Sequence, residues 1–198
     1  ENRGYVCALA NAIYMKADWV NKFEKEGTYK ETFTDINGDE SEIDFMHQAA
    51  DFKYYENGDT KAVKLPYENG LSMVVVLGDT KNILNDIHNN KMTSKLVDVS
   101  LPKFKAEYSI DYVNILKNMG IEKAFDNQNA DFSLMLENYP ERIKIDSVLQ
   151  KAMIDVDEKG TEAAAATVAV LTKSALSVDE EVIEFRADKP FTYYILDD

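Results

Sequence analysis

Three hairpin turn signals follow one another between Asp35 and Gly70 of this chain. They are Asp35-Ile36-Asn37-Gly38, Glu56-Asn57-Gly58-Asp59 and Glu68-Asn69-Gly70, and each separates runs rich in β-branched and aromatic residues. Asn and Gly tolerate the positive φ angles that tight hairpin turns require. The spacing therefore predicts an antiparallel meander, with strands over residues 28–33, 42–46, 52–55, 61–65 and 71–77.

Outside the meander, residues 5–15 are mostly apolar and uninterrupted, as expected for a strand that is buried on both faces. Trp19 and Phe23 follow at helical spacing, and residues 153–156 alternate in polarity like a strand. With the helices described next, the chain is predicted to form an α+β fold in a single domain over residues 1–198. Repeated βαβ units are not expected.

Three short helices are predicted in the remainder of the chain. The first ends near Asn90, and the second ends at Gly120, which suits the left-handed residue that closes a helix. Their apolar faces are Ile83, Leu84 and Ile87, and Tyr112, Leu116 and Met119. The expected N-terminal caps are Asp79 or Thr80 for the first helix, Ser109 for the second and Asp146 or Ser147 for the third.

Composition excludes some partners. The 198 residues carry a formal charge of −14, because 36 acidic side chains outnumber 22 basic ones. Such a surface repels phosphate, which argues against nucleic-acid binding and against docking on an anionic membrane. The single cysteine, Cys7, excludes an internal disulfide framework and a Cys-rich zinc site, but it does not decide the redox compartment.

The sequence contains no catalytic or metal-binding constellation. His47 and His88 are predicted to lie at the surface, and Cys7 is predicted to be a small core residue. No nucleophile elbow, metal-ligand spacing or glycine-rich phosphate loop occurs. Asp39-Glu40 and Asp179-Glu180-Glu181 are predicted to be solvated loops. We therefore expect a protein that is not an enzyme and that holds no metal or cofactor.

One segment, residues 157–170, does not fit an ordinary pattern. Its four consecutive alanines favour a helix. However, small uncharged residues also recur at every second position, whereas Glu162 falls on the other face of an extended chain. Such a strip could slide between two existing strands, because small side chains clash little. Composition alone leaves helix, mobile loop and latent strand open. The small face consists of Thr161, Ala163, Ala165, Thr167 and Ala169.

Motifs along the whole chain resemble those of the serpin family, in the family's order. Residues 158–180 resemble its hinge and reactive-centre loop. The hinge residues are Glu158, Gly160, Thr161, Glu162, Ala163, Ala164, Ala165, Ala166 and Thr167. Further similar motifs are Asn11-Ala12-Ile13-Tyr14 with Lys16, Trp19 and Phe23, Leu65-Pro66-Tyr67, Leu101-Pro102-Lys103-Phe104, Ala130-Asp131-Phe132-Ser133, and Phe185-Arg186-Ala187-Asp188-Lys189-Pro190-Phe191.

The chain departs mildly from the family pattern at Met15, Ala17, Gln150 and Lys159, and none of these residues puts a charge on the inserting face. The resemblance covers roughly the C-terminal half of a serpin, so the N-terminal part of the same serpin and the last strand are expected outside these residues. The resemblance implies a serpin fold, mainly antiparallel β-sheets with packed helices and an insertable reactive-centre loop.

The resemblance also implies a metastable suicide-substrate inhibitor of a serine protease. The protease would be esterified to the cleaved loop, which then inserts into the main sheet and traps the enzyme. On this hypothesis, Thr161→Arg turns the inhibitor into a substrate, because an unpaired charge would have to enter the sheet. The alternative is a non-inhibitory serpin that acts as a chaperone, carrier or storage protein.

The position of the scissile bond follows from the family's spacing. The attacked residue usually follows the hinge glycine by about fourteen positions, which gives Ser174-Ala175. Its small side chains suit an elastase-like or subtilisin-like protease. A count one residue shorter gives Lys173-Ser174, which suits a trypsin-like protease. We expect a monomer that needs no cofactor; an extracellular location is favoured, and a cytoplasmic one is the alternative.

Overall fold

The computed structural model describes residues 7–135, 143–161 and 182–197, and it is mostly β-strand. The chain divides into two compact units, which are described separately. The first comprises Glu1–Met15 and Ala106–Ile154, and the second comprises Lys16–Lys105 and Asp155–Asp198. Among the described residues, no helix is long and apolar enough to cross a membrane.

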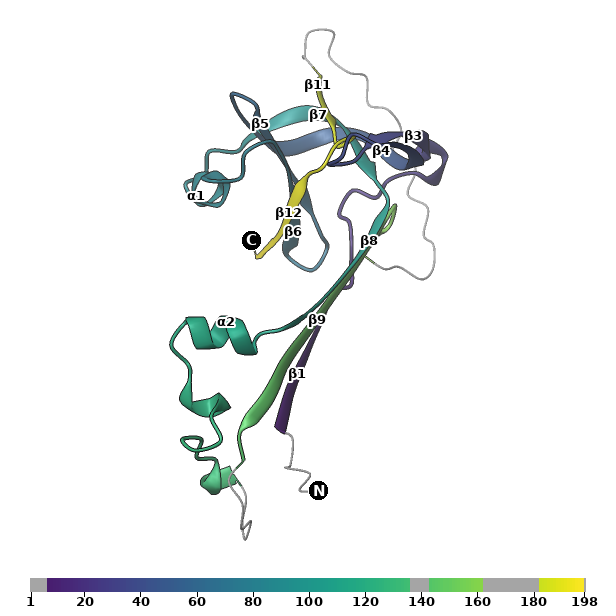
Figure 1. Cartoon of the computed structure of the whole chain (residues 1–198). Helices are drawn as coiled ribbons and strands as arrows, with labels where there is room; N and C mark the ends of the chain where they lie inside the picture. Colours follow the sequence, from purple (N-terminus) through teal and green to yellow (C-terminus); the bar gives the residue numbers. More distant parts are fainter. Residues whose placement is uncertain (1–6, 136–142, 162–181, 198) are drawn as a thin grey trace. The chain divides into compact units, whose positions relative to one another are not determined.

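The second unit contains a seven-stranded sheet (Figure 1). Its strands lie in the order β11 (Ile183–Arg186), β7 (Thr93–Pro102), β4 (Glu40–Asn57), β5 (Thr60–Pro66), β6 (Leu71–Leu77) and β12 (Thr192–Asp197). β3 (Tyr29–Thr34) also pairs with β4. The strand β11 runs parallel to β7, and the other pairs are antiparallel.

The predicted meander is confirmed. The hairpins β3–β4, β4–β5 and β5–β6 turn at the three expected places, and Gly38, Gly58 and Gly70 adopt φ angles of 87°, 58° and 83°. Strand β4 is longer than expected, because its two predicted pieces join into one strand of 18 residues. Its central part pairs with β7 over ten positions, a long-range ladder that local sequence signals do not contain.

The core of this unit lies within the sheet and beneath helix α1 (Ile83–His88). Val74, Val76 and Ala62 are fully buried and pack with Ile83 of α1. The predicted first helix is therefore present, but it is shorter than expected. It starts after Asn82 rather than at Asp79 or Thr80, and Leu84 of the expected apolar face is 46% exposed.

In the first unit, β1 (Cys7–Tyr14) runs parallel to β9 (Ile145–Asp157), and β8 (Phe104–Asp111) also pairs with β9 (Figure 1). The helix α2 (Val113–Asn118) follows β8. The remaining short elements are β2 (Ala17–Asp18), β10 (Gly160–Thr161) and the 3-10 helices Lys25–Gly27, Lys123–Phe125 and Ser133–Met135.

Two predicted helix starts are wrong. Asp146 and Ser147 lie in β9 instead of capping a third helix, and Ser109 lies in β8 instead of capping the second. β9 pairs with β1 and β8, so tertiary pairing overrides the local capping signals. The second helix is nonetheless present, and Gly120 follows it with a φ of 94°, as predicted.

The strand at residues 5–15 is confirmed over Cys7–Tyr14, but its predicted burial is wrong. Every residue of β1 after Cys7 is exposed, and Cys7 itself is half-buried rather than part of a core. Burial on both faces requires a layer on each side of the strand. Among the described residues, β1 is paired along an edge, but its faces are not covered.

Candidate functional site

The described part of the predicted hinge, residues 158–161, ends in a short strand with a partner on each edge. Gly160 and Thr161 form β10, which pairs antiparallel with β2 on one side and with Asp157 and Val156 of β9 on the other. Both hinge residues are buried, and Thr161 is 0% exposed. Of the other predicted hinge residues, only Glu158 lies within the described residues. The predicted reactive bonds, Ser174-Ala175 and Lys173-Ser174, lie outside them.

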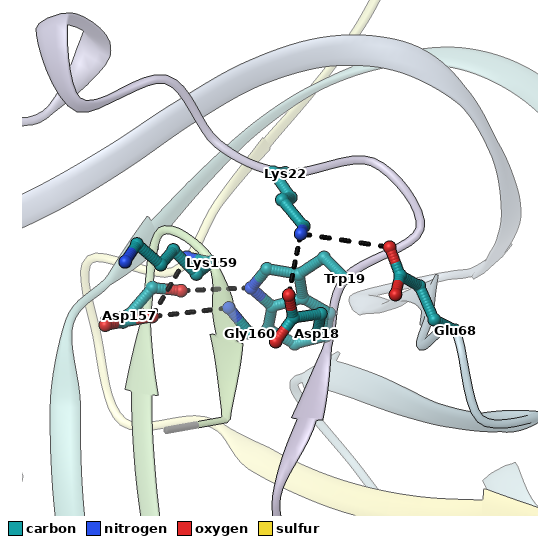
Figure 2. A network of polar contacts seen from close by, with 7 residues as sticks. All are labelled: Asp18, Trp19, Lys22, Glu68, Asp157, Lys159 and Gly160. Atoms are coloured by element: carbon teal, nitrogen blue, oxygen red, sulfur yellow. Dashed lines mark hydrogen bonds and ion pairs between the residues drawn. The ribbon is translucent and has the colours of Figure 1, made fainter. Parts of the chain in front are cut away.

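A tight turn leads from β9 into β10. One carboxylate oxygen of Asp157 accepts hydrogen bonds from the backbone N–H groups of Lys159 (2.9 Å) and Gly160 (3.3 Å), as Figure 2 shows. Gly160 has a φ of 152°, and a Cβ atom there would lie 2.1 Å from the carbonyl oxygen of Ala17. Only glycine allows the backbones to approach this closely.

Trp19 fixes this turn from the neighbouring segment. Its indole Nε1 donates a hydrogen bond to the carbonyl oxygen of Asp157 (3.0 Å). Its backbone N–H donates a second one to the carbonyl oxygen of Lys159 (2.8 Å). Figure 2 shows the indole beside the turn. Trp19 is 1% exposed. The helical spacing of Trp19 and Phe23 was misleading, because this segment is extended and Phe23 donates its N–H to the carbonyl of Glu158.

The other edge of this segment is tied to the β5–β6 turn. Val20 donates its backbone N–H to the carbonyl of Pro66, and Glu68 donates its own to the carbonyl of Asp18, both at 2.9 Å. The ammonium group of Lys22 also lies 2.6 Å from a carboxylate oxygen of Asp18 and 3.8 Å from one of Glu68 (Figure 2). These ion pairs are exposed and add little stability, so the backbone bonds position the segment.

An ion pair between buried Glu158 and partly exposed Lys103 lies at the start of the predicted hinge. Both carboxylate oxygens of Glu158 accept hydrogen bonds from the Lys103 ammonium, at 3.0 and 2.9 Å, and Glu158 is 6% exposed. Burial by itself would raise the pKa of this carboxyl group. Hydrogen bonds to the carboxylate, the strongest of them from Lys103, together with the positive charge of Lys103 outweigh the effect of burial, and the pKa of Glu158 lies below its usual value. Glu158 is therefore ionised and bound at neutral pH.

The hinge also meets an aromatic pair. The rings of Trp19 and Tyr67 stack with centroids 4.2 Å apart, and the Tyr67 hydroxyl lies 2.9 Å from Oγ1 of Thr161. Burial raises the pKa of the Tyr67 phenol well above its usual value, so the hydroxyl keeps its proton. The site thus holds Thr161 by its backbone and by its side chain.

The histidines do not form a catalytic centre. His88 is exposed at the end of α1, as predicted, but His47 is largely buried in β4, with its ring stacked on Tyr29. Its Nδ1 lies 3.0 Å from Oγ of Ser100. Ser100 is only 6% exposed, so a substrate carbonyl has no access to this hydroxyl. Among the described residues, no group of three or more potential ligands could hold a metal ion.

The chain matches a known protein family over nearly its whole length. The model of the family described as "Serpin (serine protease inhibitor)" matches residues 2–198. The chain therefore belongs to the serpin family, as its motifs predicted, and its fold is the serpin fold. Serpins are not enzymes; they typically target serine proteases.

Similar proteins come from distant organisms. An uncharacterized serpin-like protein of Thermococcus kodakarensis is 37% identical over 96% of this chain and 46% of its own length. The native state of the thermophilic serpin tengpin matches with a TM-score of 0.80 and 30% identity, covering 96% of this chain and 51% of that structure. Serpin48 of the insect Tenebrio molitor matches with a TM-score of 0.78 and 32% identity, covering 99% and 54%. The chain thus spans about half the length of these relatives.

Sequence reasoning missed two side-chain pairs of the site. Lys103 and Tyr67 lay in motifs that the resemblance used, but their partners are 55 and 94 positions away along the chain. No periodic or spacing signal in the sequence links either residue to its partner.

Proposed function

We propose that this chain is the hinge-bearing part of an inhibitory serpin, which traps a serine-type endopeptidase as a suicide substrate. In this proposal, residues 158–180 are the hinge and reactive-centre loop of a single serpin domain. The protease serine attacks the carbonyl carbon of Ser174. The amide bond to Ala175 breaks, its amine leaves with a proton, and Ser174 stays esterified to the enzyme. Lys173-Ser174 is the alternative bond.

The observation that carries the proposal is the place of β10 between two strands. Gly160 faces Asp157 and Thr161 faces Val156 in an antiparallel ladder. If this ladder continued, each further residue of the loop would pair with the preceding residue of β9. Residue 162 would then face Asp155, and residue 172 would face Ile145, the first residue of β9. The register leaves room for an inserted strand that ends just before the proposed bond.

The same register explains the pattern of small residues. Directly opposed residues of neighbouring strands lie on the same face of the sheet. Ala163 would share a face with Val156 and Ile154, which are 1% and 6% exposed, whereas Glu162 would lie on the more open face with Asp155. The small side chains of the loop would thus enter the buried face, and its charge would stay outside.

Energetics favour insertion once the loop is cut. At present β1 and β9 pair directly over eight positions. A strand inserted between them would pair with β1 on one edge and with β9 on the other, and the direct β1–β9 ladder would be lost. The net gain would be about ten main-chain hydrogen bonds. At about 1 kcal/mol each, the gain is about 10 kcal/mol, comparable with the stability of a typical domain. The uncleaved form would therefore be held kinetically.

The test uses the full-length protein and a panel of elastase-like, subtilisin-like and trypsin-like proteases. We expect a protease complex that survives SDS, and mass spectrometry of the released peptide should give Ala175 as its first residue. A first residue of Ser174 would establish the alternative bond. Cleavage without any covalent complex, across the panel, would contradict inhibition and favour the chaperone, carrier or storage function.

A further inference from the structure

The two-residue strand β10 has only one side chain with which to anchor itself. Gly160 has none, so Thr161 carries the only side chain of this strand. Its hydroxyl lies 2.9 Å from the hydroxyl of Tyr67, and the two residues are 0% and 2% exposed. A buried hydroxyl that loses its hydrogen-bond partner destabilises the folded state. This hydrogen bond therefore has a large effect on whether such a short strand stays in place.

The other half of the pair is held rigidly. The Tyr67 ring stacks on Trp19 at an interplanar angle of 13°, and the backbones of these residues form an isolated β-bridge. Trp19 in turn binds the turn at Asp157 and Lys159. Tyr67 thus presents its hydroxyl from the β5–β6 side of the site, on a support that already contacts the hinge turn.

We propose that Tyr67 is a positioning residue that docks Thr161 in the sheet before the loop is cleaved. The bond holds the first residue of the loop in the register that further insertion would continue. It shortens the search for that register, because loop closure and strand alignment are then complete at one end. The effect on inhibition rests on the proposed function, whereas the docking itself does not.

The first test measures docking by amide hydrogen exchange at Gly160 and Thr161 in the uncleaved, full-length protein. Tyr67→Phe keeps the stacked ring and removes the hydroxyl, and Thr161→Val removes the other partner. Each variant should raise the exchange rates about fivefold or more, and the double variant should exchange no faster than either single one. Thr161→Ser keeps a hydroxyl and should stay near the unsubstituted protein.

Tyr54→Phe is the matched control. Tyr54 is 4% exposed, and its hydroxyl donates a hydrogen bond of 2.9 Å to Glu56, away from the hinge. This variant should leave exchange at Gly160 and Thr161 unchanged. Unchanged exchange in Tyr67→Phe, or additive effects in the double variant, would overturn the inference that Tyr67 docks Thr161.

The second test measures the consequence for inhibition. The number of serpin molecules consumed per protease inhibited should rise at least twofold in Tyr67→Phe and Thr161→Val, but not in Thr161→Ser or Tyr54→Phe. An equal number in all variants would overturn the role of docking in insertion. If the unsubstituted protein forms no covalent complex, the proposed function fails, while the exchange data still decide whether Tyr67 docks Thr161.

Discussion

The seven-stranded sheet of the second unit and the β1–β9 pair of the first unit are held together in different ways. In the former, Phe45, Val75 and Leu101 are 0% exposed, so side-chain packing adds to the ladders. In the latter, β1 pairs with β9 over eight positions, yet Leu9 and Ile13 are 48% and 50% exposed. Within the described residues, a backbone ladder joins β1 to β9, and the side chains of β1 do not enter a packed core.

Under the proposed function, the strands that exchange partners are those of the β1–β9 ladder and not those of the packed sheet. An incoming strand can replace the main-chain bonds of a ladder with equivalent ones, so an exchange of partners costs little. A packed core cannot open in this way, because each displaced side chain leaves a cavity. The proposed insertion next to β9 uses the first kind of contact and leaves the packed sheet intact.

Cleavage of the loop should produce the largest effect. In the full-length protein, a cut between Ser174 and Ala175 should raise the melting temperature by about 20 °C or more, since about ten additional bonds contribute about 10 kcal/mol. Calorimetry before and after the cut measures this shift. An unchanged melting temperature would mean that the β1–β9 ladder does not exchange, and it would favour a non-inhibitory serpin.

A charge on the small face should block insertion. Ala163→Arg would place an unpaired guanidinium opposite Ile154, which is 6% exposed, and burial of such a charge costs several kcal/mol. We expect the yield of SDS-stable complex to fall by more than about tenfold, with cleaved serpin in its place. Glu162→Arg is the control, because residue 162 would face Asp155 on the more open side under the proposed register. Equal yields from the two variants would contradict the register.

Ala163→Arg tests insertion more cleanly than Thr161→Arg, the substitution suggested by the resemblance. Thr161 is already buried in the uncleaved protein and bonded to Tyr67. An arginine there would disturb the hinge before the protease arrives, so a loss of inhibition would have two causes. Ala163 is the first position of the small face at which the substitution reports on insertion under the proposed register.

Hydrogen exchange should separate the two sheets directly. In the uncleaved full-length protein, the amides of β1 should exchange at least tenfold faster than those of β7, because the proposed insertion requires the β1–β9 ladder to open, whereas β7 lies in a packed core. After loop cleavage, protection should increase in β1 and remain constant in β7. Equal protection of both strands before cleavage would contradict the distinction between an exchangeable and a fixed sheet.

Local turn signals made the meander predictable, whereas the pairing of strands that are distant in the sequence could not be predicted. Gly38, Gly58 and Gly70 mark turns through their own backbone preferences, and the structure has them there. Ser109 and Ser147 carry an equally local capping signal, yet they lie in strands that pair with distant partners. A capping residue indicates the structure that a segment would favour in isolation. In the folded protein, pairing with distant strands determines the structure that the segment adopts.

The hinge shows a similar limit. The resemblance identified Glu158, Gly160 and Thr161 by position, and the requirement for glycine at residue 160 has a plain steric cause in the structure. The partners Lys103 and Tyr67 could not be assigned, because a hydrogen bond between distant residues leaves no periodic trace in one sequence. Only the fold brings these side chains together.

The smallest expected effect concerns pH and the Glu158–Lys103 pair. Burial alone would raise the pKa of Glu158, but the hydrogen bonds to its carboxylate, the strongest of them from Lys103, and the charge of Lys103 together lower it below its usual value in the folded protein. A carboxyl group with a lowered pKa stabilises the fold above its usual pKa, near 4.3, and this contribution disappears as the pH falls through the lowered value. Lys103 is partly exposed, so we expect about 1 kcal/mol.

Glu158→Gln measures this contribution. The unfolding free energy of the full-length protein should exceed that of the variant by about 1 kcal/mol at pH 7, and the difference should shrink toward zero near pH 3. Glu68→Gln is the control, because its carboxylate is 3.8 Å from Lys22 and 60% exposed, and it should show little difference at any pH. A constant difference for Glu158→Gln between pH 7 and pH 3 would mean that shape, not charge, secures the start of the hinge. The ion pair would then add nothing to the contacts made by Trp19 and Tyr67.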